Sequence, residues 1–434
     1  MILDIPMPLP DFENHEASQE VLFKEQVTIP LYTFYNCVKI HFGLTSITFL
    51  AIGGFTFMKQ IIAYFKKETV LCCAWVLAIV SMFLVTPDKG YAEYIDFRSL
   101  GILWSLMVIM QGLKENGVFE QTGLWLLHKT KRVWQLCAVL IFLCFFSSMF
   151  ITNDVALITF VPFAIMLLKS CKRSELTIPV VVLQTVAANL GSMSTPIGNP
   201  QNLYLYGISN LSLVSFMNNL LPYTGVSFIL LTAAILFLPG KSEIVAITED
   251  GRKTSVYVHS GIPSGVQDGI YGILFVIALF TVAKIIPLSI LMGAVLISVC
   301  LMDKGIIKKA DYGLLLTFIG FFIFTGNLGR IPAFTTTLAS LVAGREVLTG
   351  VVASQCISNV PAALLLSGFT GDYKELLVGV NLGGLGTLIA SMASLISYKL
   401  YVTEYTETKG KYFIFFTLAN VFFLIILMMT SMVV

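Results

Sequence analysis

Two short polar stretches interrupt apolar segments of this chain, and both consist of residues that could bind a small ion. The first contains Thr152, Asn153 and Asp154, and the second contains Ser358 and Asn359. Hydroxyl and amide groups can replace the water around a small oxyanion, because they supply both donors and acceptors. Asp154 is ionisable, and a carboxylate inside an apolar segment is typical of a cation or proton site. Its alternative role is to cap the helix that follows it.

Two longer apolar segments, 177–207 and 375–398, are broken by glycine, proline and small polar residues. Helices rarely continue through such a composition. An unwound stretch leaves carbonyl oxygens that can coordinate a cation, and the helix start that follows can face an anion. A plain kink with small residues for close helix packing is the alternative. The polar and glycine residues of these breaks are Ser192, Ser194, Thr195, Gly198 and Asn199 in the first, and Gly383, Gly386 and Thr387 in the second.

The composition indicates where these groups lie. Of the 434 residues, 56% are apolar and only 12% are charged, whereas an ordinary soluble domain carries about 25% charged residues. Apolar stretches recur along the chain at about the 20-residue length that crosses a bilayer core. The sequence therefore predicts an all-α integral membrane protein and excludes a soluble enzyme, a disulfide scaffold and a nucleic-acid binder.

The segment 134–169 carries lysine and arginine at both outer ends, with the Thr-Asn-Asp stretch in its middle. Both ends are expected in the cytoplasm, so the segment must enter the membrane, turn and return as a re-entrant helical hairpin. Non-helical backbone at that depth is tolerated only inside protein or beside a water-filled cavity. Residues 346–369 have the same form and predict a second hairpin.

The chain divides into four parts by composition. We expect an acidic tail and interfacial segment at 1–40, a first transmembrane repeat at 41–239, a cytoplasmic linker at 240–267 and a second repeat at 268–434. Each repeat would hold five spans, one hairpin and one broken helix. Because five is odd, the second repeat would be inverted relative to the first, as in many secondary transporters.

Three sequence echoes support the repeat. Residues 95–97 resemble 310–312, 151–153 resemble 357–359, and 188–192 resemble 380–384.

Metal and enzyme motifs do not accompany these features. The cysteines and histidines lack zinc or haem spacing, and the sequence contains no HExxH, GxSxG or P-loop motif. We therefore expect no catalytic residues, no enzyme activity and no cofactor beyond Na⁺ or H⁺ as a coupling ion. The expected partners are a small anionic substrate and the lipid bilayer, without nucleic acid, and with a homodimer as an open option.

The hairpin tips, the stretch Ser-Thr-Pro-Ile-Gly-Asn-Pro-Gln-Asn at 194–202 and the repeats resemble the ion transporter superfamily. That group includes divalent anion/sodium symporters, citrate transporters and the arsenite-pump membrane subunit, and the resemblance covers about residues 68–434. It implies substrate binding by Thr152, Asn153, Ser194, Thr195, Asn199, Ser358, Asn359 and Thr387. From the ionisable carboxylate and the unwound carbonyls, we also predict cation coupling at Asp154, Ser192, Gly198, Gly383 and Gly386, with Na⁺ held near Asp154, Asn153 and Asn359.

Asp154 and Val360 stand where the dicarboxylate branch of that superfamily has threonine. The Thr-Asn-Asp form is more similar to the arsenite and sodium/proton-exchanging branches. We therefore expect a multi-pass plasma-membrane protein that moves a carboxylate or inorganic oxyanion, coupled to Na⁺ or H⁺, by alternating access. A cation/proton antiporter or an arsenite-type efflux permease that uses Asp154 is the alternative. A channel and an intramembrane enzyme are less favoured classes.

Overall fold

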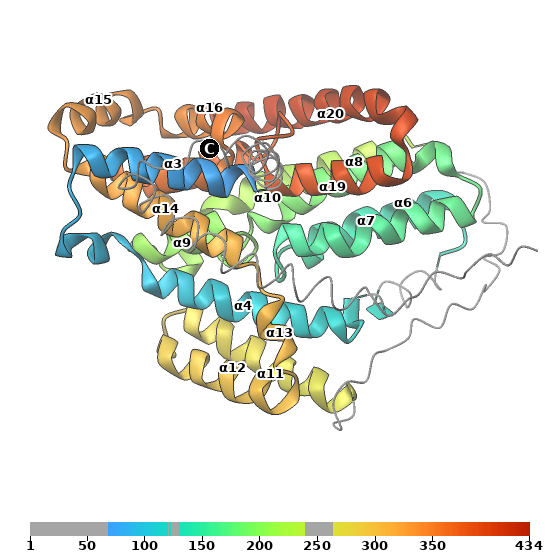
Figure 1. Cartoon of the computed structure of the whole chain (residues 1–434). Coiled ribbons are helices and arrows are strands. Elements are labelled where there is room, and N and C mark those ends of the chain that lie inside the picture. The colour runs from blue at the N-terminus through green and yellow to red at the C-terminus, as the bar shows by residue number, and fades with distance from the viewer. Residues whose placement is uncertain (1–67, 120, 123–129, 239–263) are drawn as a thin grey trace, which may run out of the picture. The chain divides into compact units, whose positions relative to one another are not determined.

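The computed structural model describes residues 68–434 apart from 120, 123–129 and 239–263 (Figure 1). The acidic tail and most of the predicted linker therefore lie outside the described residues. The described part is helical, and no strand occurs within it. Six of its helices are long and apolar enough to cross a membrane, or seven if one bent pair is counted as a span. The prediction of an all-α membrane fold is confirmed.

The described helices include both predicted hairpins, 134–169 and 346–369, and both predicted broken segments, 177–207 and 375–398. In the first half they are α3 (Thr69–Leu84), α4 (Phe97–Glu115), α6 (Val133–Ser147), α7 (Asn153–Ser170), α8 (Thr177–Ser192), α9 (Pro200–Ile208) and α10 (Leu213–Leu236). In the second half they are α11 (Ser264–Val282), α12 (Leu288–Met302), α13 (Gly305–Lys308), α14 (Tyr312–Gly329), α15 (Pro332–Val342), α16 (Glu346–Ile357), α17 (Asn359–Leu366), α18 (Tyr373–Leu382), α19 (Met392–Glu404) and α20 (Lys409–Thr430).

Two boundaries differ from the expectation. Helix α11 begins at Ser264, so its first turn falls inside the stretch 240–267 that was expected to be linker. Helix α15 was not expected, and it meets α16 at an angle of 111°. Its Thr-rich sequence is too short and too polar to register as an apolar span.

Local capping explains how several helices start. Asp96 and Asp311, at matching places in one sequence echo, are the N-caps of α4 and α14 and accept the backbone N–H groups of Ser99 and Leu314 at 3.0 Å each. An aspartate in this position satisfies one of the N–H groups that the first turn leaves without a partner. The echo therefore marks equivalent helix starts in the two halves.

Burial distinguishes lipid-facing helices from an inner group of helices. Helices α10, α11 and α20 expose much of their apolar surface, as expected next to lipid. Helix α8 is almost wholly buried and packs against both arms of the first hairpin, α6 and α7. In the second half, α18 packs against α16 and α17 in the same way. In Figure 1, α6 and α7 lie at the right and α15 lies at the upper left.

This arrangement gives a topological prediction. In a variant without other cysteines, Cys171 and a cysteine at the exposed Lys304 should react with a membrane-impermeant maleimide only from the cytoplasm. Cysteines at Lys89 and Gly371, both exposed, should react only from outside. The reason is that lysine and arginine concentrate at the cytoplasmic ends of spans. Labelling of Cys171 and Gly371→Cys from one side would refute the inverted repeat.

Candidate functional site

The two hairpin tips make matching backbone contacts with the two helix breaks. The N–H of Asn153, the first residue of α7, donates to the carbonyl of Gly198 at 3.1 Å. The N–H of Asn359, the first residue of α17, donates to the carbonyl of Ala390 at 2.9 Å. Each acceptor lies immediately before the N-cap residue of the helix that resumes after the break, α9 or α19. Each tip is therefore fixed to the break of its own half.

Asn189, three residues before the end of α8, connects the first tip to the second break. Its Oδ1 accepts the side-chain N–H of Asn153 at 3.0 Å and the hydroxyl of Ser391 at 3.1 Å. Its Nδ2 lies 3.4 Å from both the carbonyl of Gly384 and the hydroxyl of Ser394. Since Ser391 follows the residue that binds the second tip, Asn189 brings both tips into one polar cluster.

Asn381 makes the reciprocal connection from α18 to the first break. Its Oδ1 accepts the side-chain N–H of Asn199 at 3.1 Å, and its Nδ2 donates to Oδ1 of Asn202 at 2.7 Å. Asn199 is the N-cap of α9. Helix α8 therefore contacts the start of α19, and α18 contacts the start of α9. Side-chain amides hold the two breaks together.

The carbonyls of the first break also receive an amide. Nδ2 of Asn202 lies 3.1 Å from the carbonyls of Met193 and Thr195 and 3.4 Å from that of Ser192. In the second break, Nε2 of Gln355 lies near two carbonyls in a similar way. Buried carbonyls need such partners. The sequence predicts free carbonyls here, and the structure pairs them with side chains.

The remaining hydroxyls of the breaks hold the local structure. Ser192 donates to the carbonyl of Asn189 at 2.9 Å, and Thr195 donates to the carbonyl of Met149. Ser194 donates to the carbonyl of Gly191 at 2.8 Å and contacts Thr224 of α10. These three groups are therefore engaged in fixing the first break.

The break glycines allow close packing. A Cβ on Gly383 would lie 2.5 Å from the hydroxyl of Ser354, and one on Gly191 would lie 2.6 Å from that of Ser148. A Cβ on Gly198 would lie 2.1 Å from the carbonyl of Ser192. The close-packing alternative for these residues therefore holds as well. The cation-coupling role assigned to Ser192, Gly198, Gly383 and Gly386 stays a prediction.

Three of the predicted site residues keep polar side-chain groups that form no hydrogen bond within the described part of the chain. They are Thr152 and Asp154 at the first tip and Asn359 at the second. Oδ1 of Asp154 is buried and has no hydrogen-bond partner among the residues that the structure describes. Nδ2 of Asn359 lies against Gly384, so the amide faces the second break. These groups are available to a ligand.

Asp154 does not cap α7. The helix begins at Asn153 with Thr152 as its N-cap, which places Asp154 inside the first turn. The alternative role as the N-cap is therefore not observed, because the tip turns one residue earlier than the apolar pattern indicates. Its charge still lies at the favourable end of the helix dipole.

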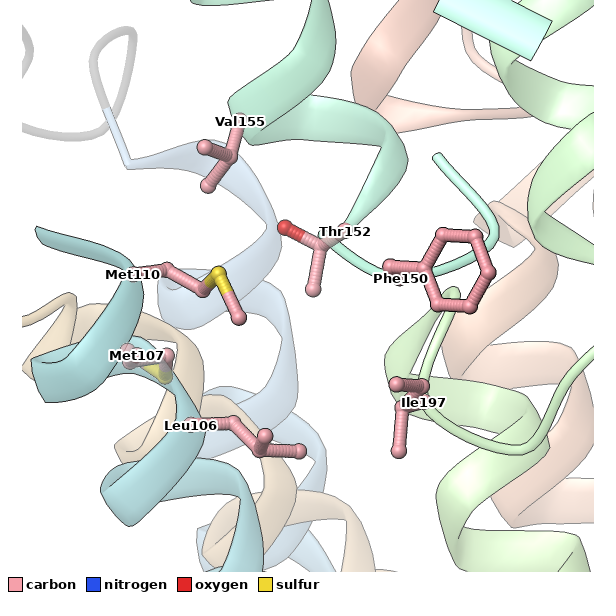
Figure 2. A pocket seen from close by; sticks show the side chains of 7 residues that line it. All are labelled: Leu106, Met107, Met110, Phe150, Thr152, Val155 and Ile197. Atoms are coloured by element: carbon pink, nitrogen blue, oxygen red, sulfur yellow. The ribbon is translucent and has the colours of Figure 1, made fainter. Parts of the chain in front are cut away.

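Thr152 faces a small cavity between the first tip and α4. Figure 2 shows Thr152 and Val155 on one side of it and Met107 and Met110 on the other. Its volume is about 20 Å³, which is room for one water molecule. The first tip is therefore not tightly packed against α4. The lining residues are Leu106, Met107, Met110, Phe150, Thr152, Val155 and Ile197.

The second tip is conformationally strained. Ser358 has a φ of 73°, whereas Thr152 at the first tip has a φ of −61°. A non-glycine residue in this region costs energy and is often found at ligand sites. The hydroxyl of Ser358 lies 3.4 Å from the carbonyl of Ala390. Thr387 is exposed, and its N–H donates to Oε1 of Gln355 at 2.9 Å.

Sequence reasoning left Asn189, Asn202, Gln355 and Asn381 out of the site. Asn189 and Asn381 occupy equivalent positions in the third echo, and Asn202 ends the 194–202 stretch. A rule that every polar residue in these patterns belongs to the site would have found these three asparagines. Gln355 has only a weak signal, a single amide in an apolar hairpin arm.

Comparisons with known proteins identify transporters as relatives of this chain. The family described as citrate transporter matches residues 49–370. An uncharacterized transporter of Methanocaldococcus jannaschii is 30% identical over 75% of this chain and 86% of its own length. The inner membrane protein YbiR of Escherichia coli is 29% identical over 74% of this chain and 84% of its own. The silicon efflux transporter LSI3 of Oryza sativa is 34% identical over 34% of this chain and 30% of its own.

The matched region contains both hairpin tips and the whole first break, whereas the second break lies beyond its end at residue 370. The predicted resemblance is confirmed. The chain belongs to the citrate transporter family within the ion transporter superfamily, and it is a multi-pass membrane transporter.

Proposed function

We propose that this protein is a secondary active transporter of a small anion in the plasma membrane, coupled to Na⁺ or H⁺. The observation that carries the proposal is the meeting of two hairpin tips and two helix breaks in one polar cluster, with Thr152, Asp154 and Asn359 left available to a ligand. Helix starts and neutral donors can hold an anion there without a buried lysine or arginine.

The substrate class we propose is a carboxylate or an inorganic oxyanion. The family description, citrate transporter, supports the first. The name of the rice relative, a silicon efflux transporter, supports the second. Val360 at the second tip lacks the hydroxyl of the threonine that the dicarboxylate branch of the superfamily has there. This absence favours a smaller or less charged anion.

Alternating access would move each hairpin together with its break. The backbone bonds from Asn153 to Gly198 and from Asn359 to Ala390 support joint movement. The cavity beside Thr152 supports movement of the first tip against α4, because that contact is incompletely filled. Helices α3, α4, α11, α12 and α14 would form the scaffold.

A cation/proton antiporter or an arsenite-type efflux permease is the second candidate. The observation that favours it is the Asp154 carboxylate, whose Oδ1 is buried without a hydrogen-bond partner in the described part of the chain. Ionisable groups at this depth commonly carry protons or cations. In this mechanism Asp154 would bind the exchanged cation or proton.

Transport in proteoliposomes separates these candidates. Purified protein would be tested with radiolabelled citrate, other carboxylates, silicate and arsenite under separately imposed Na⁺ and H⁺ gradients. We expect accumulation of at least one anion that requires one gradient. Accumulation independent of both gradients would refute secondary active transport. Cation exchange without movement of any anion would favour the antiporter.

A further inference from the structure

The side chain of Gln355 fills the second helix break. It lies in the last turn of α16, three residues before the tip residue Ser358. Its Nε2 donates to the carbonyls of Gly383 at 3.0 Å and Leu385 at 2.9 Å, and its Oε1 accepts the N–H of Thr387 at 2.9 Å. One amide therefore binds the backbone on both sides of the break.

The backbone conformation of the break leaves room for this amide. Gly386 has a φ of 106°, and a Cβ there would lie 2.3 Å from Oε1 of Gln355. The first hairpin has Met149 at the corresponding position, three residues before Thr152. There the amide for the break carbonyls comes from Asn202 on α9. The two halves thus use side-chain amides from different positions to donate hydrogen bonds to the carbonyls of their breaks.

We infer that Gln355 is a positioning residue whose Nε2 occupies the place of a cation in the second break, which closes that break to a coupling ion. Carbonyls of unwound helices are the usual Na⁺ ligands in transporters, and here Gly383 and Leu385 are already paired. In the first break, Asn202 pairs the carbonyls of Met193 and Thr195. The inference rests on the proposed function and deepens it, because it leaves Asp154 in the first half as the coupling-ion ligand.

The test measures Na⁺ binding by thermal stability of the purified full-length protein, in NaCl against choline chloride at equal concentration. Gln355→Glu keeps the acceptor for Thr387 and replaces the N–H donor by a charged oxygen beside two carbonyls. We expect Na⁺ to raise the Tm of the Gln355→Glu variant by about 1–2 °C more than it raises the Tm of the wild type. This size assumes a dissociation constant about tenfold below the Na⁺ concentration. A folded Gln355→Glu variant without this gain would overturn the inference.

Gln184→Glu is the matched control. Nε2 of Gln355 lies near the carbonyl of Val351 as well as the two of the break. Nε2 of Gln184 lies near two backbone carbonyls, those of Leu140 and Phe160, but its site is fully buried and contains no break. We expect this variant to lose Tm equally in both salts. A Na⁺-specific rise equal to that of Gln355→Glu would show a general effect of buried glutamate and overturn the assignment to the break.

Two further comparisons keep the inference testable. Any Na⁺ response of the wild type should disappear in Asp154→Asn, and a response that survives there would overturn it. If Gln355→Glu does not fold, Gln355→Lys supplies a tethered cation and Gln355→Met supplies the residue of the first hairpin. The Lys variant should have the higher Tm, and the reverse order would overturn the inference. These measurements need no transport, so anion transport can fail independently of them.

Discussion

Asp154→Asn should abolish gradient-driven transport while the protein remains folded. The substitution keeps the size of the side chain and removes the negative charge of the carboxylate, whose Oδ1 has no hydrogen-bond partner within the described residues. Because Asp154 lies in the first turn of α7 and does not cap it, the loss of stability is limited to the helix-dipole contribution, about 0.3–1 kcal/mol. The measurement is uptake in proteoliposomes under imposed Na⁺ or H⁺ gradients, together with Tm.

Asp96→Asn is the control for this variant. Asp96 caps α4 through the N–H of Ser99, and asparagine caps a helix about as well. It should therefore leave transport and Tm nearly unchanged. Normal gradient-driven transport by Asp154→Asn would eliminate its coupling role. Residual activity with an unchanged pH profile would favour Na⁺ over H⁺ as the ion it binds.

Asn359→Ala should reduce transport strongly with little change in stability, and Asn153→Ala should reduce both. The amide of Asn359 makes no hydrogen bond within the described residues, whereas that of Asn153 donates to Asn189 at 3.0 Å. A hydrogen bond to a charged ligand is worth about 1.5–3 kcal/mol, or roughly ten- to a hundredfold in affinity. The lost bond to Asn189 should cost about 1 kcal/mol of unfolding free energy.

Substrate concentration dependence and Tm are the measurements for these variants. Asn420→Ala is the control, since its amide is buried in α20 and donates to the carbonyl of Phe416 at 2.9 Å. It should lower Tm without raising the apparent KM. Wild-type transport by both tip variants would reduce Asn153 and Asn359 to residues of the hairpin turns. Equal losses of Tm in the two would contradict the different roles assigned to them.

Much of the fold could be predicted because membrane helices depend on local properties of the chain. A bilayer core requires about 20 apolar residues per span, so composition alone placed most helices. The tip residues and the breaks stood out for a similar reason, since amides, glycines and prolines are conspicuous in apolar sequence. Helix α15 was missed because it is short and threonine-rich, and its position depends on the sharp bend before α16.

The sequence by itself therefore determined the membrane class, the two hairpins with Asn153 and Asn359 at their tips, and the two helix breaks. Only the tertiary structure decided which polar groups are engaged and which are available. Asn189 reaches Ser391, and Asn381 reaches Asn199, across about 200 residues of sequence. No periodicity encodes such pairs, because a hydrogen bond requires atoms within about 3.5 Å and that distance is set by packing.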